Sequence, residues 1–143
     1  MRTVLVLGST GSVGTQTLEM IRANPDKFKL LGISGNSNAE LLESQRAEFS
    51  LSKDAVALGP EMAAALAGGI GADVVVNGIT GSAGLAATLA TLKAGSKLAL
   101  ANKESLIVGG SLVTDIAAKD QIQPVDSEHS AIAQCLLSGS HGE

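Results

Sequence analysis

Short apolar bursts rich in Val, Ile and Leu recur along this 143-residue chain, separated by stretches whose hydrophobic spacing suits helices. Such bursts are typical of strands in a parallel sheet that helices cover on both faces. The predicted strands are residues 3–7, 29–34, 55–58, 73–78, 97–101 and 121–125. The pattern therefore predicts an α/β fold in one compact domain.

The intervals between these bursts carry helix signals. The predicted helices are residues 12–23, 38 to about 49, a segment from 60, 82–94, about 105–119 and about 128–137. Asn38 and Ser82 are the expected N-caps, because their side-chain oxygens can accept hydrogen bonds from the free amides of a first turn. Leu41 and Leu42 are expected to point inward, and Gly109 with Gly110 to weaken the fifth helix.

Composition excludes several classes of function. Aromatic residues make up 1% of the chain and the formal net charge is −4, so neither a stacking platform nor a phosphate-neutralising surface for nucleic acid is expected. Cys135 is the single cysteine, which excludes an internal disulfide and a cysteine-rich zinc site. We recognise no membrane span and no export signal, and expect a cytoplasmic protein.

A glycine-rich segment, Gly8-Ser9-Thr10-Gly11-Ser12-Val13-Gly14, follows the first strand and opens the first helix. In this context a turn of small residues directs free backbone amides at a pyrophosphate, and the hydroxyls of Ser9, Thr10 and Ser12 add donors. This favours a Rossmann-like, doubly wound and mostly parallel sheet. The alternative is an ordinary strand-to-helix turn in which Gly14 serves close packing.

The end of the second strand bears on the choice of cofactor. Sites that prefer NAD place an acidic side chain there, about 20 residues beyond the glycines. Residues 33–38 read Ile-Ser-Gly-Asn-Ser-Asn and contain no carboxylate that would repel a 2′-phosphate. The sequence therefore favours NADP, although no Arg or Lys is present there to bind that phosphate.

Two further polar clusters follow strands, Asn102-Lys103-Glu104 and Asp126-Ser127-Glu128-His129. Because ligands of open parallel sheets bind beyond the carboxyl ends of strands, both clusters are expected at the edge that holds the glycines. Asp126 and Glu128 can converge on Mg²⁺ or Mn²⁺, yet the same residues suit the capped first turn of a helix. Without the other motifs, the alternative interpretation of Lys103 is a solvated surface lysine beside Glu104.

These motifs together resemble the amino-terminal part of the 1-deoxy-D-xylulose 5-phosphate reductoisomerase family. The resemblance rests on residues 8–14, 100–106 and 124–132 and runs over essentially the whole chain. It implies an enzyme that uses NADPH and a divalent metal, Mg²⁺ or Mn²⁺, to convert 1-deoxy-D-xylulose 5-phosphate into 2-C-methyl-D-erythritol 4-phosphate in the non-mevalonate isoprenoid route. The family enzymes are usually homodimers, with a phosphorylated sugar as substrate and neither nucleic acid nor membrane as partner.

The resemblance also implies roles for individual residues. NADPH would be bound by Thr10, Gly11, Ser12, Val13, Gly35, Asn36, Asn38, Asn102 and Glu104. Lys103, Ser127 and Glu128 would contact the substrate, and Asp126 with Glu128 would bind the metal. Lys103, Asp126 and Glu128 would then be the catalytic residues.

Residues 1–143 would form the NADPH-binding domain, with the start of the catalytic region at about 124–143. The family continues into a catalytic and a helical domain that this sequence lacks, so the 143 residues alone are expected to be inactive. The interval 58–73 is shorter than is usual for the family, by about one helix and one strand. Two other functions are considered, a non-catalytic NADP-binding module and another NADP-dependent reductase that shares only the glycine-rich turn.

Overall fold

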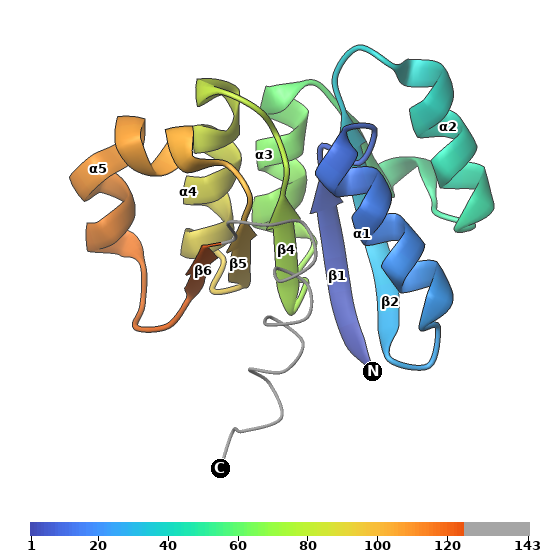
Figure 1. Ribbon diagram of the computed structural model, residues 1–143, viewed down its shortest axis with the longest axis horizontal. Coiled ribbons are helices and arrows are strands. Elements are labelled where there is room, and N and C mark those ends of the chain that lie inside the picture. The colour runs from blue at the N-terminus through green and yellow to red at the C-terminus, as the bar shows by residue number, and fades with distance from the viewer. Residues whose placement is uncertain (125–143) are drawn as a thin grey trace.

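The computed structural model describes residues 1–124, and its core is one parallel sheet with helices on both faces (Figure 1). The strands are β1 (Arg2–Leu7), β2 (Phe28–Gly35), β3 (Val56–Leu58), β4 (Val74–Asn77), β5 (Lys97–Leu100) and β6 (Ile122–Pro124). The helices are α1 (Ser12–Ala23), α2 (Ala39–Glu48), α3 (Pro60–Gly69), α4 (Leu85–Lys93) and α5 (Lys103–Ile116), with short 3-10 turns η1 (Lys53–Ala55) and η2 (Ser82–Gly84).

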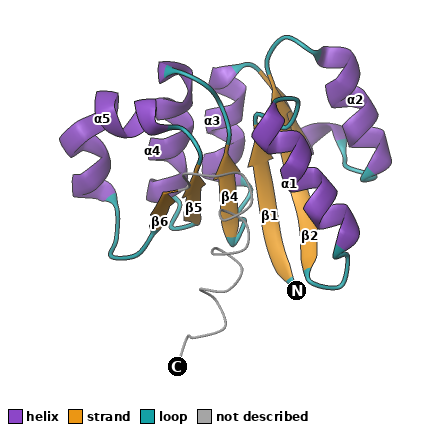
Figure 2. Ribbon diagram, viewed as in Figure 1, coloured by secondary structure: helices purple, strands orange, loops and turns teal. Residues whose placement is uncertain are grey.

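The strand order is β3-β2-β1-β4-β5-β6, and each of the five pairings within the described sheet is parallel. Strands and helices alternate along the chain (Figure 2), as the sequence predicts for a doubly wound fold. The interval predicted to be short is crossed by α3 alone, and β3 pairs directly with β2. The described sheet therefore has no gap at this point.

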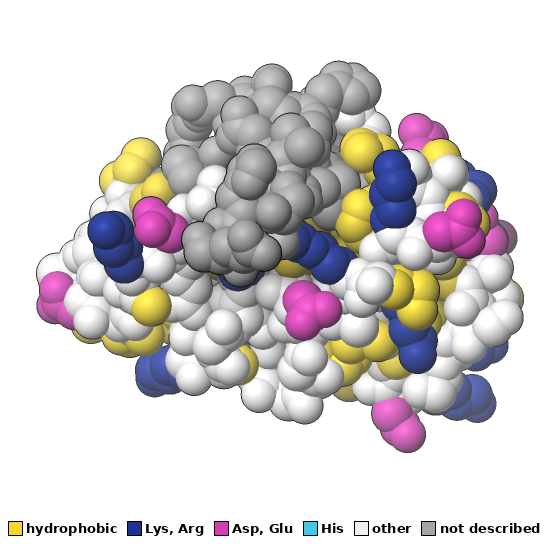
Figure 3. All heavy atoms as spheres, turned by 90° about the horizontal axis from the view of Figure 1, so that it is seen from below, with side chains coloured by type: hydrophobic (Ala, Val, Ile, Leu, Met, Phe, Trp, Pro, Cys, Tyr) yellow, Lys and Arg dark blue, Asp and Glu magenta, His cyan; other side chains and the backbone are white. Residues whose placement is uncertain are grey.

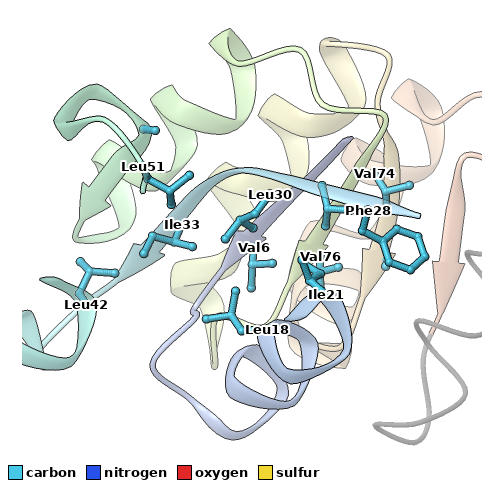
Figure 4. Close-up of a cluster of buried hydrophobic side chains, with 13 residues drawn as sticks. Val6, Leu18, Ile21, Phe28, Leu30, Ile33, Leu42, Leu51, Val74 and Val76 are labelled. Atoms are coloured by element: carbon cyan, nitrogen blue, oxygen red, sulfur yellow. The ribbon is translucent and has the colours of Figure 1, made fainter. Parts of the chain in front are cut away.

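Alternating residues of β1 divide the core between the two faces of the sheet. Val4 and Val6 pack with residues of α1 and α2, among them Leu18, Ile21 and Leu42 (Figure 4). Leu5 and Leu7 face the other way, and pack with the small residues that α3 and α4 bury against the sheet. This alternation is the period of two that a strand imposes, so burial on both faces explains the continuous apolar bursts.

The starts of two helices differ from the prediction. Ser82 does not cap a helix: it begins η2, and α4 starts at Leu85 without a side-chain cap. The next helix starts at Lys103 rather than near residue 105, because the Asn102 side chain accepts a hydrogen bond from the Glu104 amide at 2.9 Å. This helix, α5, ends at Ile116 and is kinked at Gly110, whose φ of 43° is not helical.

The edge at the amino ends of the strands has its own polar contacts. Just before β4, the Asp73 carboxylate accepts hydrogen bonds from the Thr3 amide and hydroxyl, both at 2.8 Å, and these lower the pKa of Asp73. The Ser96 hydroxyl donates to the Ala72 carbonyl at 2.7 Å. Charged side chains of both signs are scattered over this face (Figure 3). Among the helices of residues 1–124, none is long and apolar enough to cross a membrane.

Candidate functional site

A hollow of about 260 Å³ lies at the carboxyl edge of the sheet, where the strand order reverses between β1 and β4. Ligands of open α/β sheets bind at such a switch point. Four loops line the hollow: Gly8, Thr10 and Gly11 after β1, Ser34, Gly35 and Asn36 at the end of β2, Gly59, Pro60 and Ala63 after β3, and Gly78, Ile79, Thr80 and Ala83 after β4.

The N-terminus of α1 opens beside this hollow. Its N-cap is Gly11, no side chain caps the helix, and its first turn has no acidic residue. The first amides of a helix have no partner within the helix, and the helix dipole places partial positive charge at this end. The arrangement suits an anionic group such as phosphate, which backbone amides bind without a cationic side chain.

The three glycines of the turn have different reasons to be glycine. Gly8 has a φ of +74°, and a Cβ on Gly14 would lie 2.2 Å from the Gly8 carbonyl oxygen, so both are required by the fold. A Cβ on Gly11 would meet only that oxygen, at 3.4 Å, which is an ordinary contact. The packing of Gly14 is thus the one the sequence suggested, whereas Gly11 leaves space next to the open helix end.

The Ser9 hydroxyl is not free to donate to a ligand in the hollow, so its prediction as a phosphate donor is wrong. The side chain is buried and donates to the Gln45 Oε1 of α2 at 2.7 Å, while the Gln45 Nε2 donates back to the Ser9 carbonyl at 3.0 Å. This pair fixes the turn against α2. Thr10 and Ser12 keep accessible surface, whereas Val13 packs its side chain against the core.

The end of β2 places only part of the predicted ribose contact in the hollow. Gly35 and Asn36 line it, but the Asn38 side chain is the N-cap of α2 and accepts a hydrogen bond from the Leu41 amide at 3.0 Å. Leu42 is buried as predicted, and Leu41 only partly. No charged side chain is among the described residues that line the hollow.

The cluster after β5 lies at the same edge. Asn102 is buried, and its Nδ2 donates to the carbonyls of Ile79 and Gly81 in the loop after β4. Its amide group is therefore occupied within the protein. Glu104 is exposed in the first turn of α5, and Lys103 is the first residue of that helix. Two of the three predicted clusters thus lie at the same edge of the sheet, as expected.

The predicted metal ligands Asp126 and Glu128, together with Ser127, lie outside the described residues, as do His129, Cys135 and the helix predicted over 128–137. Within residues 1–124, no group of three or more His, Cys, Asp or Glu side chains is placed to hold a metal ion. The choice between a metal site and a helix cap at Asp126 therefore stays a prediction.

Sequence reasoning missed two walls of the hollow, the turn at Gly59 and the loop after β4. The signal for that loop was a glycine, Gly78, directly after a strong strand; a Cβ on Gly8 would lie 2.9 Å from its carbonyl. A larger hollow, of about 430 Å³ between η1, β3 and α3, is lined mainly by apolar side chains such as Val56, Met62 and Leu66. It lacks the convergent polar groups that orient a ligand.

The strand order and the glycine-rich turn define a Rossmann-like domain. Its hollow at the switch point suits an anionic ligand. The family model for 1-deoxy-D-xylulose 5-phosphate reductoisomerase matches residues 4–58 and 50–110. The chain belongs to the 1-deoxy-D-xylulose 5-phosphate reductoisomerase family.

Curated relatives with that name show the same likeness. The protein of Leifsonia xyli is 54% identical over 143 residues, which are 100% of this chain and 39% of the relative. That of Rhodococcus jostii is 52% identical over 155 residues, 98% of this chain and 39% of the relative. The chain thus spans about two fifths of the length of these relatives.

The fold agrees with solved structures of the family. A crystal structure of DOX-P reductoisomerase in complex with NADPH, fosmidomycin and magnesium superposes with a TM-score of 0.80 at 35% identity. The match covers 94% of this chain and 39% of that one. The Rossmann-like fold predicted from the sequence is therefore confirmed.

Proposed function

We propose that this chain is the NADPH-binding part of a 1-deoxy-D-xylulose 5-phosphate reductoisomerase. The observation that carries the proposal is the N-terminus of α1, which no side chain caps and which lies beside the hollow at the switch point. The names of the relatives, and the NADPH and magnesium named for a solved structure, support the same activity. The reaction would reduce and isomerise 1-deoxy-D-xylulose 5-phosphate to 2-C-methyl-D-erythritol 4-phosphate.

The residues present fit the cofactor. The pyrophosphate would lie against Thr10, Gly11, Ser12 and Val13. The Gly11 amide donates to the Gly8 carbonyl at 3.1 Å, so Gly11 would contribute room for the approach rather than a free donor. Gly35 and Asn36 would meet the adenosine ribose, and Asn38 would stay near it as the cap of α2. When bound, NADPH supplies the hydride for the reduction.

The nicotinamide side would lie toward Asn102 and Glu104. The side-chain amide of Asn102 is already bonded to the loop after β4. We therefore propose that Asn102 shapes the wall that this loop forms, and that any contact between Asn102 and NADPH is made by its backbone. Among the described residues that line the hollow there is no carboxylate to repel a 2′-phosphate, and this supports NADP over NAD.

The remaining roles follow the resemblance. Asp126 and Glu128 would bind Mg²⁺ or Mn²⁺, while Lys103 and Ser127 would contact the phosphorylated sugar. A divalent metal there would stabilise negative charge that develops on substrate oxygens. We further propose residues 1–143 as the cofactor domain, with the catalytic region starting at about residue 124, in a cytoplasmic homodimer.

The test begins with binding. Titration with NADPH, followed by its fluorescence, should show saturable binding that is tighter than binding of NADH. Equal affinity for both would contradict the NADP preference, and no binding of either would contradict the proposal.

Catalysis is tested in a protein of the relatives' full length that contains this chain, by consumption of NADPH with 1-deoxy-D-xylulose 5-phosphate and Mg²⁺. There Asp126→Ala should abolish metal-dependent turnover and leave NADPH binding intact. If this variant instead loses only about 1 kcal/mol of stability and keeps its activity, Asp126 is a helix cap and not a ligand.

A further inference from the structure

The loop of residues 78–84, here called the β4 loop, forms one wall of the hollow through Gly78, Ile79, Thr80 and Ala83. We propose that Asn77 is a positioning residue for the cofactor site, which holds this loop in the shape that NADPH requires. The inference rests on the proposed function, and it assigns a role to a residue that does not line the hollow itself.

Asn77 ties the two ends of the β4 loop to each other. It is fully buried at the end of β4. Its Nδ2 donates to the Gly84 carbonyl and to the Thr88 hydroxyl of α4, both at 3.0 Å, and its Oδ1 accepts from the Ile79 amide at 3.1 Å. One side chain thus fixes the first turn of the loop, its last residue and the helix that follows.

The position of Asn77 in the strand argues that it serves the loop and not the core. Alternation along β4 directs Val75 toward the face that α3 and α4 cover, and Asn77 falls on the same face. An apolar residue is expected there, because burying an amide costs free energy unless its hydrogen bonds are made. In Asn77 both side-chain atoms make them, and two of the three partners belong to the β4 loop.

A second asparagine, Asn102, also hydrogen-bonds to the β4 loop. The Nδ2 of Asn102 donates to the carbonyl of Gly81 at 2.7 Å and also to that of Ile79. Between the two asparagines Gly84 has no spare room, because a Cβ there would lie 3.0 Å from the Asn102 Nδ2 and 3.0 Å from the Ile79 carbonyl. Ile79, which lines the hollow, is therefore held through its amide by Asn77 and through its carbonyl by Asn102.

The substitution Asn77→Asp tests the role with little change of shape. It keeps an oxygen for the Ile79 amide, but turns a carboxylate oxygen toward the Gly84 carbonyl, which cannot donate. We expect the Kd for NADPH, from fluorescence titration, to rise about tenfold, the equivalent of about one net hydrogen bond. Thr88→Val removes only the Thr88 bond to Asn77 and should raise Kd less.

Two control variants separate positioning from loss of stability. Ser96→Ala deletes a buried hydrogen bond of 2.7 Å at the opposite edge of the sheet, so it should lower Tm without changing Kd. Ser105 is buried next to Gly84, but its hydroxyl makes no hydrogen bond with the described residues, so Ser105→Ala should change neither.

The outcomes are distinct. A raised Kd in both Asn77→Asp and the uncharged variant Thr88→Val, with unchanged Kd in Ser96→Ala at a similar loss of Tm, supports the proposal. A raised Kd in Asn77→Asp alone reflects repulsion between the new carboxylate and the phosphates of NADPH and overturns the proposal. Wild-type affinity in Asn77→Asp overturns it while leaving the proposed function intact, and if that variant does not fold, wild-type affinity in Thr88→Val overturns it. A wild-type protein that binds no NADPH overturns both proposals.

Discussion

At the scale of single residues, Gly11 and Gly14 form a matched pair. Gly14→Ala would force a Cβ to 2.2 Å from the Gly8 carbonyl oxygen, so we expect a loss of stability of about 1–3 kcal/mol or more. Gly11→Ala meets no close atom of the protein and should leave stability within about 1 kcal/mol of wild type. Urea unfolding measures both differences.

The same pair separates folding from binding. In Gly11→Ala the added methyl group lies where the pyrophosphate would approach, so NADPH affinity should fall although the fold is kept. If Gly11→Ala binds NADPH as wild type does, the pyrophosphate does not lie against this glycine.

The hydrogen bonds of Asp73 predict that the free energy of unfolding depends on pH in acid. Hydrogen bonds from Thr3 lower its pKa in the folded protein, so the carboxylate contributes stability above its unfolded pKa of about 3.9. That contribution is lost as the pH falls through the lowered, folded value. Unfolding by urea between about pH 5 and pH 2 should therefore show a smaller acid-induced loss in Asp73→Asn than in wild type. Identical slopes would show that Thr3 does not stabilise the charged form.

At the scale of elements, the start of α2 links helix formation to the site. Asn38→Ala removes the hydrogen bond to the Leu41 amide and should lower the free energy of unfolding by about 1 kcal/mol. Asn38→Ser retains a capping oxygen and should keep most of that stability. If Asn38→Ser nevertheless binds NADPH more weakly, the amide group has a second role at the ribose. Thermal unfolding and NADPH titration of the two variants decide this.

The start of α5 shows how one side chain can serve an element and a site together. Asn102 caps the helix through Oδ1 and holds the β4 loop through Nδ2. A capped start at residue 103 places Lys103 and Glu104 in the first helical turn, at the carboxyl edge of the sheet. The helix therefore begins where the substrate and the nicotinamide are proposed to meet.

At the scale of the whole molecule, the chain spans about two fifths of the length of its relatives, and we propose the activity for a protein of their full length. We expect the 143-residue chain to bind NADPH but to show no turnover with 1-deoxy-D-xylulose 5-phosphate and Mg²⁺. Two carboxylates alone would hold the metal poorly and leave it open to water. A spectrophotometric assay of NADPH consumption checks this, and measurable turnover would contradict it.

The interval 58–73, which is predicted to be short for the family and contains α3, is compatible with the fold. The family model matches in two ranges that overlap at residues 50–58, just before the predicted short interval. The Leifsonia xyli protein aligns over 143 residues, this chain's own length, whereas the Rhodococcus jostii alignment needs 155. Because β3 still pairs with β2 at the sheet edge, the turn at Gly59 that follows β3 keeps its place in the wall of the hollow.

The order of strands and helices and the glycine-rich turn could be predicted from the sequence, because they depend on local hydrophobic period, local caps and backbone freedom. The span of α1 and the cap at Asn38 are confirmed to the residue. Motifs also placed Asn102 at the carboxyl edge, since every strand of a parallel sheet ends there.

Only the tertiary structure decided which loops share the hollow and which polar atoms remain free to meet a ligand. Ser9 and Ser12 look equivalent in the sequence, yet Gln45, 36 positions beyond Ser9, engages the Ser9 hydroxyl. Asn77 reads as the end of an apolar strand, and its bonds to the β4 loop appear only once the chain has turned back over it. The Ser9 contact depends on packing between distant segments, and the Asn77 contacts depend on the path that the β4 loop takes at the sheet edge. The local hydrophobic pattern carries no information about either.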